Sequence, residues 1–509
     1  MSVTAKLKRL DELRSIADRL RKSKKRLVHC HGVFDLLHLG HIRHLNAAKK
    51  FGDILFVTLT ADRYVKRGPG RPVFNHDLRA ETLANLAVAD YVAVVHSPTA
   101  VDAIKTIRPH FYVKGSDYSN KEQDLTAKIY DEESLVKEHG GKLVFTDDLT
   151  FSSSQLLNLH LDSYPEETVK YLKKLSAKYS IDFIAQSMKR MSKLKILVIG
   201  DTIIDQYHYC VAMGKSSKES IVAHRYVSEE DFAGGSLATA NHVAQVSKRV
   251  DLATVLGKQN SFEPFIRDRL DPHIRPRFFP STNSVTTIKR RYVSQERNRK
   301  MFEICYLDDF LLAKSVESRI ASYLRSNLSK FDLVIVSDFG HGMITKDIVE
   351  VLCAKAKCLA INVQTNSANL GFNLVTKFPR ADFVCIDQLE LQLATGERHE
   401  AMSSLVRRIQ RQLKAKQVIA TRGSSGSISY NKKDGIHEAP TYSRQSVDTM
   451  GAGDAFYSFA APCFAAGVPQ DLLSFIGNAA GALKVEIIGN RDPVRIVDLM
   501  KFMSRLLKV

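Results

Sequence analysis

The sequence predicts an α/β protein built from two doubly wound parallel sheets. Short apolar runs alternate with segments of helical periodicity in two successive series, and this alternation is typical of parallel sheets covered by helices. A length of 509 residues exceeds that of one ordinary domain. The composition, with 44% hydrophobic and 25% charged residues, lies in the range of globular proteins that bury large cores.

The first series is predicted to form a domain over residues 1–160. Residues 4–25 place apolar side chains at helical spacing with Lys and Arg between them. This pattern favours a helix that packs one face and solvates the other over a helix lying on a membrane surface. Strands are predicted at 26–30, 53–59, 91–95, 111–113 and 143–145.

The second series is predicted to form a domain over residues 193–509. It follows a charged segment, 161–192, which has a helical pattern and no strand signal and is therefore expected to be a helical linker. The predicted strands of this second domain lie at 195–200, 332–337, 358–363, 382–386 and 417–421.

The charge balance favours anionic partners. The formal net charge is +19 and the sequence pI is about 9.5. The chain has no nucleic-acid-binding motif and no Trp, so phosphorylated small molecules or scattered surface charge explain the balance better than nucleic acid. No apolar run has membrane-spanning length. The seven cysteines form no CxxC pair, which indicates reduced thiols in a cytoplasmic protein. From the missing motifs and apolar runs we expect neither nucleic acid nor a membrane as a partner.

The segment from His31 to His41 carries the first functional signal. His38 and His41 lie three residues apart at the start of a predicted helix, so both imidazoles can lie on one side of its first turn. The helix N-terminus adds backbone N–H groups that favour an anion. Gly32 and Gly40 permit close approach of the backbone to a ligand. The segment therefore predicts a site for nucleotide phosphates.

This segment resembles the Gly-x-Phe-Asp…His-x-Gly-His signature of the cytidylyltransferase-like nucleotidyltransferases, and matching elements continue through about residue 155. The resemblance implies attack by a phosphomonoester on the α-phosphorus of a nucleoside triphosphate, with release of pyrophosphate. It assigns triphosphate contacts to His38 and His41 and neutralisation of the reacting phosphates to Lys66. The remaining nucleotide-binding residues that it implies are Gly32, Phe34, Asp35, Gly40, Arg79, Lys114, Gly115, Ser152, Ser153 and Ser154.

Two alternatives bear on this site. His29, His31 and His44 suggest a metal cluster, but no carboxylate or cysteine set completes one in the sequence. Related cytidylyltransferases carry an Arg-Thr-x-Gly run before the last helix, whereas residues 146–151 here read Thr-Asp-Asp-Leu-Thr-Phe without arginine. Both ATP and CTP therefore stay open as the nucleotide.

The run from Asp448 to Phe456 carries the second signal. Its glycines at 451 and 453 precede a helical pattern and can present backbone N–H groups to charge that develops in phosphoryl transfer. Asp454 can accept a proton from a sugar hydroxyl. The run resembles the Asp-Thr-x-Gly-Ala-Gly-Asp-x-Phe signature of ribokinase-type (PfkB) carbohydrate kinases, which implies a catalytic Asp454 and nucleotide binding by Gly451, Ala452 and Gly453.

Other elements of this kinase family follow in the expected order. The resemblance implies further nucleotide-binding residues at Thr421, Gly423, Gly426 and Asn478. It implies substrate-binding residues at Asp201, Asp205, Gly234, Gly235 and Asn241. It implies magnesium-linked residues at Asp387 and Glu390. Lys289 and Arg291 are further candidates for an acidic group on the substrate, although an edge strand rich in Lys and Arg also explains them.

Two positions depart from the kinase family. Gln364 stands where related sugar kinases have the lysine of Asp-Pro-Lys, and Asp387 stands where they have the asparagine of Asn-x-x-Glu. The aspartate keeps an oxygen that suits a metal, whereas the glutamine removes a charge from the phosphate site. Altered specificity and an inactive kinase domain are both compatible with these changes.

Together the two halves resemble the bifunctional heptose kinase/nucleotidyltransferases of bacterial surface-polysaccharide synthesis, with the domain order reversed. The resemblance implies ATP-dependent phosphorylation of a sugar phosphate, expected to be a heptose 7-phosphate, at its anomeric hydroxyl. It also implies transfer of AMP or CMP to a sugar 1-phosphate, a requirement for Mg²⁺, and a homo-oligomer, expected to be a dimer. The alternative is a nucleotidyltransferase fused to a degenerate kinase domain that serves as sensor or scaffold.

Overall fold

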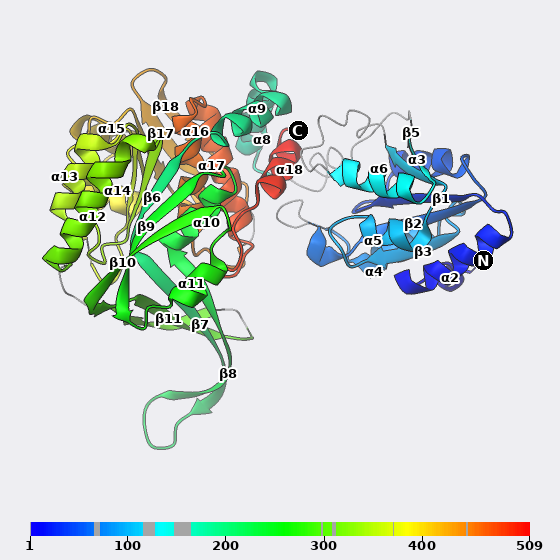
Figure 1. Cartoon of the computed structure of the whole chain (residues 1–509), viewed down its shortest axis with the longest axis horizontal. Coiled ribbons are helices and arrows are strands. Elements are labelled where there is room, and N and C mark those ends of the chain that lie inside the picture. The colour runs from blue at the N-terminus through cyan, green and yellow to red at the C-terminus, as the bar shows by residue number, and fades with distance from the viewer. Residues whose placement is uncertain are drawn as a thin grey trace. The chain divides into compact units, whose positions relative to one another are not determined.

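A computed structural model describes residues 2–65, 72–115, 128–146, 164–296, 299–307, 312–369, 371–443 and 446–508. The chain forms two compact units (Figure 1). One comprises Met1–Asp182 with Met500–Val509, and the other comprises Phe183–Leu499. None of the helices in the described ranges combines the length and the apolar character needed to cross a membrane.

The first unit is a parallel five-stranded sheet with strand order β3-β2-β1-β4-β5. Alternate residues of β1 serve opposite faces: Val28 packs in the core with helices α3 and α4, and Leu27 packs in the core with α2 and α5. The strands are β1 Leu27–Gly32, β2 Ile54–Thr60, β3 Tyr91–Val95, β4 Phe111–Gly115 and β5 Lys142–Thr146. The helices are α2 Leu10–Lys22, α3 Leu39–Lys49, α4 His76–Ala84, α5 Val101–Ile107 and α6 Lys128–Glu138.

The N-terminal segment differs from the single helix expected over residues 4–25. It forms a short helix, α1 Val3–Lys6, and then the separate helix α2. Leu7 between them is extended and bridges to Val92 of the sheet. A capping box between Arg9 and Glu12 then starts α2. The periodicity continues across the break because both pieces bury apolar side chains against the same unit.

The second unit is built on a nine-stranded sheet with order β10-β9-β6-β13-β14-β15-β16-β17-β18. Strands β10 to β16 pair in parallel, and β17 and β18 are antiparallel additions. Its strands are β6 Ile196–Gly200, β9 Val250–Gln259, β10 Ile274–Val285, β13 Leu333–Asp338, β14 Leu359–Val363, β15 Phe383–Asp387, β16 Gln417–Thr421, β17 Ser427–Asn431 and β18 Gly435–Ala439. The predicted class, α/β with doubly wound parallel sheets, is confirmed.

Helices cover both faces of this sheet (Figure 1). One layer consists of α12 Lys314–Asn327, α13 Lys346–Lys355, α14 Gln388–Thr395 and α15 Met402–Gln412. The opposite layer consists of α10 Ser236–Ala244, α16 Ala452–Ala465 and α17 Gln470–Lys484. Outside these two layers, the structure has the helices α8 Glu166–Lys178, α9 Ile181–Met191 and α18 Ile496–Leu506. The short helix α11 Glu263–Arg269 lies between β9 and β10 in the chain.

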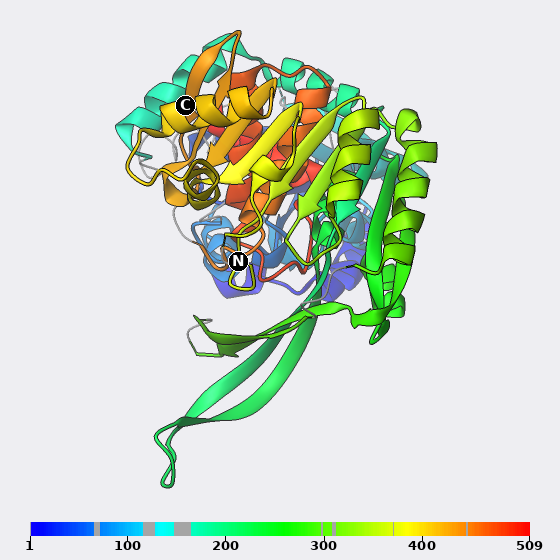
Figure 2. The same ribbon diagram turned by 90° about the vertical axis from the view of Figure 1, so that its left-hand side faces the viewer.

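A second sheet of four strands, in the order β12-β11-β7-β8, was not expected from the sequence. Figure 2 shows the outer ends of β7 and β8 extending away from the nine-stranded sheet and its helices. The strands are β7 Thr202–Lys215, β8 Val222–Gly235, β11 Thr287–Ser294 and β12 Arg299–Tyr306. Lys289 and Arg291 lie on β11, which is an interior strand between β7 and β12 and not the edge strand considered above.

Close packing of β6 against β13 gives a prediction for stability. A Cβ atom at Gly200 would lie 1.9 Å from the backbone oxygen of Ser337, so we expect Gly200→Ala to destabilise the second unit by about 1–3 kcal/mol. Urea unfolding monitored by circular dichroism measures this loss as a lower midpoint. Gly481→Ala is the matched control, because its Cβ would meet only the Ala452 oxygen at 3.6 Å. Equal midpoints for the two variants would contradict the prediction.

Candidate active sites

The loop from β1 to α3 is fixed by Phe34 and Asp35. Phe34 has a left-handed backbone, with φ of +49°, and its ring lies 3.1 Å from the position of a Cβ at Gly32. A side chain at position 32 would therefore crowd the ring. The buried Asp35 accepts a hydrogen bond from the backbone N–H of Val73 at 2.6 Å. These residues, predicted to bind nucleotide, set the path of the chain into α3.

His38 and His41 begin α3 as a contacting pair. Nδ1 of His38 accepts the N–H of Gly40 at 3.1 Å, and Nδ1 of His41 accepts the N–H of His38 at 3.4 Å. The ring centroids are 4.0 Å apart. Burial lowers the pKa of His38 and favours the neutral ring. Since Nδ1 accepts in both rings, a neutral ring carries its proton on Nε2, where it can donate to a phosphate oxygen.

Threonines hold the other histidines of this region. Thr58 Oγ1 contacts Nε2 of His29 at 2.7 Å and Nδ1 of His31 at 2.8 Å. His44 Nδ1 contacts Thr146 Oγ1 at 2.9 Å. Burial lowers the pKa of His29 to about 3, so this ring is neutral. Sequence reasoning missed Thr58 because a threonine in a β-branched strand carries no signal of its own.

The guanidinium of Arg79 is buried, with its side chain 1% exposed. It donates to the backbone oxygens of Val33 and Thr60 and to the carboxylate of Asp62. It thereby ties α4 to the ends of β1 and β2. Lys114 forms an ion pair with Glu132 at 2.9 Å. Among the described residues, no atom lies within 4 Å of a Cβ at Gly115. The predictions for Lys66, Ser152, Ser153 and Ser154 fall outside the described residues.

In the second unit, the start of α16 adjoins the ends of the parallel strands. Gly451 precedes the helix with φ of +76°, and a Cβ there would meet Asn490 Oδ1 at 2.7 Å. In the part of the chain that the structure describes, no atom lies within 4 Å of a Cβ at Gly453. In this first turn the N–H of Ala452 donates to the Thr449 oxygen at 3.3 Å, and the Cβ direction of Gly453 faces open space among the described residues. Such a helix start binds anions.

Asp454 lies in this first turn and is buried. Burial raises its pKa to about 6. Gln364 Nε2 donates to Asp454 Oδ1 at 2.7 Å and to Asn362 Oδ1 at 3.1 Å. Asn362 in turn donates its own Nδ2 to the Cys385 oxygen at 2.7 Å, which orients both amides. Gln364, which stands where related kinases have a lysine, therefore positions the predicted catalytic base, Asp454.

The second sheet brings Asp205, Lys289 and Arg291 together. Lys289 of β11 pairs in register with Asp205 of β7, and alternation places Arg291 on the same face of its strand. Arg291 binds Asp205 at 2.5 Å and Glu303 at 2.7 Å. Lys289 is only 8% exposed, and its ammonium has no ion-pair partner within the described part of the chain. A Cβ at Gly234 would lie 2.2 Å from Asp205 Oδ2, which explains the glycine.

Two residues that were predicted to bind substrate, Asp201 and Asn241, form hydrogen bonds with the protein backbone. The buried carboxylate of Asp201 accepts N–H groups from Phe339, His341 and Met343 at 2.8–3.3 Å. Asn241 donates to the Arg269 oxygen at 3.0 Å and accepts from Asp271 N–H at 2.9 Å. Gly235, with φ of +60°, precedes α10. These residues shape the site walls, whereas Asp205 lies with the buried cations.

The predicted metal residues form a helix cap. Asp387 Oδ1 accepts Glu390 N–H, and Glu390 accepts the N–H groups of Asp387 and Thr365. Burial and the neighbouring Asp387 raise the pKa of Glu390 to about 8. Within the described ranges, no three His, Cys, Asp or Glu side chains gather as a metal site. Both oxygens of Glu390 accept backbone N–H groups, so in this structure the pair caps the start of α14.

The predicted nucleotide-binding elements beyond β16 form a tight turn. Thr421 ends β16, and Gly423 and Gly426 have φ values of +54° and +80°. A Cβ at Gly426 would lie 2.1 Å from the Ala439 oxygen. Asn478 donates to Ser427 Oγ at 2.9 Å and so ties α17 to the same turn.

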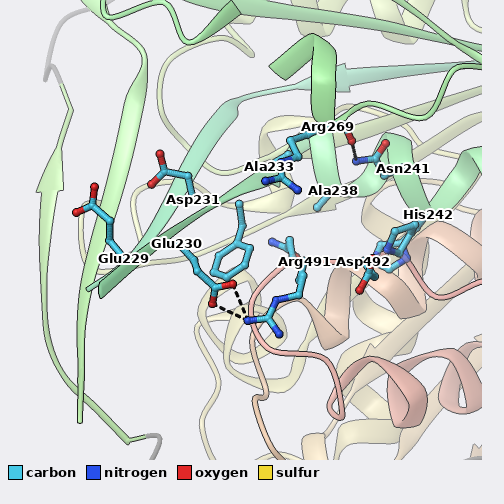
Figure 3. Close-up of a pocket in the computed structure, with 13 residues that line it drawn as sticks. Glu229, Glu230, Asp231, Ala233, Ala238, Asn241, His242, Arg269, Arg491 and Asp492 are labelled. Carbon is cyan, nitrogen blue, oxygen red and sulfur yellow. Dashed lines mark hydrogen bonds and ion pairs between the residues drawn. The ribbon is translucent and has the colours of Figure 1, made fainter. Parts of the chain in front are cut away.

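A cavity of about 370 Å³ is lined by residues of β8, α10 and α11 and by residues 490–493 (Figure 3). Asn490 lines it and also donates to Asp205 Oδ2 at 3.3 Å, so the cavity adjoins the cluster of Asp205, Lys289 and Arg291. An ion pair between Glu230 and Arg491, 2.5 Å long, stands in its wall. Further charged lining residues are Glu229, Asp231, Arg269 and Asp492.

Comparison with known families supports two different domains. Residues 193–496 match the model of the pfkB family carbohydrate kinases, and residues 29–158 match the cytidylyltransferase-like model. The predicted order, nucleotidyltransferase first and kinase second, is confirmed.

Similar curated proteins bear the name bifunctional protein HldE. The protein from Aliarcobacter butzleri is 41% identical over 138 residues, which are 27% of this chain and 29% of that protein. The protein from Geobacter sulfurreducens is 36% identical over 168 residues, 32% of each chain. The chain thus spans about a third of the length of the curated relatives it matches.

A solved structure shares the fold of the second unit. Phosphofructokinase-2 from Escherichia coli in complex with potassium aligns with a TM-score of 0.51 at 13% sequence identity. The alignment covers 62% of this chain and 99% of that one.

Proposed function

Because the chain belongs to the pfkB family of carbohydrate kinases, we propose that its second unit transfers the γ-phosphoryl group of ATP to a sugar hydroxyl. The observation that carries this proposal is the position of Asp454, a buried carboxylate in the first turn of α16 beside open space. Asp454 accepts the hydroxyl proton as the oxygen attacks. The backbone N–H group of Gly453, in the first turn of α16, stabilises the negative charge on the transferred phosphoryl group.

The substrate is a sugar that carries its own phosphate, and we propose a heptose 7-phosphate phosphorylated at its anomeric hydroxyl. Lys289 supports an anionic substrate, since a buried ammonium without an ion-pair partner in the described chain is costly unless a ligand neutralises it. The name shared by the bifunctional relatives supports the pairing of two activities in one chain.

The first unit would then join AMP from ATP to the sugar 1-phosphate and release pyrophosphate. His38 and His41 support this role, because Nε2–H groups at a helix start suit the charge that develops on the phosphates. A phosphatase-type reaction must act between the two steps if the distal phosphate is to be removed. CTP is the alternative nucleotide.

Magnesium would accompany ATP in the kinase. Bound with the nucleotide, it would neutralise the phosphate oxygens. Asp387 and Glu390 would hold its hydration shell, which fits a carboxylate pair already used as a helix cap.

We expect a homodimer, with contact through the second sheet. Alternate residues of β12 present Phe302, Ile304 and Tyr306 with exposed fractions of 53%, 40% and 41%. Apolar side chains that alternate along a solvent-facing strand favour association with a second copy. A phosphofructokinase-2 of the same fold is described as tetrameric.

The decisive experiment incubates the full chain with a panel of sugar phosphates and each nucleoside triphosphate, with mass spectrometry of the products. We expect a sugar bisphosphate with ATP alone, and an ADP-linked sugar when a sugar 1-phosphate is supplied. Nucleotide sugar without any sugar-dependent ADP would favour the degenerate kinase domain. A product linked to CDP only would contradict the choice of ATP for the first unit.

A further inference from the structure

Lys484 is a buried lysine that neither the sequence motifs nor the proposed mechanism uses. It ends α17, and its side chain is 0% exposed. Its ammonium donates to the backbone oxygens of Gly489 at 2.6 Å, Met450 at 2.8 Å and Ile487 at 3.5 Å. Within the described residues it forms no ion pair with a carboxylate. Backbone carbonyls are therefore its ligands.

This ammonium lies under the start of α16. A Cβ at Gly451 would be 3.2 Å from Lys484 Cε and 3.4 Å from Nζ. The Met450 carbonyl directly precedes Gly451, and Gly489 N–H donates to Asp448 Oδ2 at 2.8 Å. Lys484 thus joins the segment that leads into α16 to the turn that follows α17.

Charged side chains around the Lys484 ammonium affect its protonation. The carboxylates of Asp448, Asp454 and Asp205 favour the ammonium from a distance, and Lys300 opposes it. Burial nevertheless lowers the pKa of Lys484 to about 8. A buried cation without a paired anion costs stability, so its retention calls for a function. Several backbone carbonyls around one positive charge are the ligand set that proteins use for a monovalent metal ion.

We propose that the Lys484 ammonium is a tethered monovalent cation of the kinase site. It occupies the carbonyl ligands that a free K⁺ or NH₄⁺ would otherwise take, fixes the N–H groups of Gly451 to Gly453, and adds positive potential beneath the transferred phosphoryl group. This inference rests on the proposed kinase activity. The kinase reaction of this chain therefore needs no added monovalent cation.

The experiment compares the full-length wild type with Lys484→Met in buffers that contain tetramethylammonium, K⁺ or NH₄⁺ as the sole monovalent cation. We expect equal rates of sugar-dependent ADP formation for the wild type in all three. We expect Lys484→Met to lose about 10²–10³-fold in tetramethylammonium and to regain at least about tenfold in K⁺ or NH₄⁺, since a small cation restores the missing charge. A purely structural lysine would show no such rescue.

Each other outcome is informative. A wild type that needs K⁺ overturns the inference, and that measurement stands even if Lys484→Met fails to fold. A folded, inactive variant that no cation rescues also overturns it. A wild type that produces no sugar-dependent ADP in any buffer instead contradicts the proposed kinase activity. The nucleotidyltransferase reaction of the same chain and the thermal unfolding midpoint report whether the variant is intact.

Discussion

Replacing Asp454 with asparagine is expected to reduce sugar-dependent ADP formation by about 10²–10⁴-fold, the contribution of a positioned general base. Asparagine preserves the volume of the side chain and can still contact Gln364, so α16 should keep its start. It cannot accept the proton that leaves the sugar hydroxyl. The coupled measurement of ADP release at saturating sugar phosphate tests this directly.

The pH dependence provides an independent check on the same residue. Burial raises the pKa of Asp454 to about 6, and the base works only when it is deprotonated. The wild-type rate should therefore fall as the pH drops through about 6, and the residual rate of Asp454→Asn should lack that acid limb. Nucleotide-sugar formation by the first unit is the internal control. An unchanged kinase rate in a folded variant would remove Asp454 from the role of base.

Most of the fold was accessible from the sequence because its signal is local. Apolar runs such as 195–200 and 332–337 alternate with helical periodicity, and they became β6 and β13. The four-stranded sheet escaped detection because β7 and β8 change character along their length: buried near the nine-stranded sheet, they become exposed at their outer ends. Only tertiary pairing explains such a strand.

The site could be predicted where the chemistry lies in a motif. Asp454 and the glycines before it stand together in the chain, whereas the groups that tune them do not. Gln364 contacts Asp454 across 90 positions of sequence, and its sequence signal was only a missing lysine. Lys484 resembles an ordinary cation at a helix C-terminus. Its burial under Gly451 depends on how α16 and α17 pack.

The nucleotidyltransferase reaction should depend on His41 to a similar degree. We expect His41→Ala to slow nucleotide-sugar formation by about 10²–10³-fold, the usual cost of one lost donor to a developing phosphate charge. His41 also accepts the N–H of His38 at 3.4 Å and contacts its ring, so the change additionally loosens the second donor. Pyrophosphate release from ATP and sugar 1-phosphate measures the effect.

The matched control is His139→Ala, which removes an imidazole that lies beyond the end of α6 in the same unit. It should leave pyrophosphate release unchanged, and both variants should keep the kinase rate of the wild type. The mechanism requires the loss to appear in kcat rather than in the KM for sugar 1-phosphate, because Nε2–H would act on charge that forms in the transition state. A rise in KM alone would make His41 a residue that binds the substrate in its ground state. An equally large loss of activity in His139→Ala would contradict the assignment of His38 and His41 to the active site.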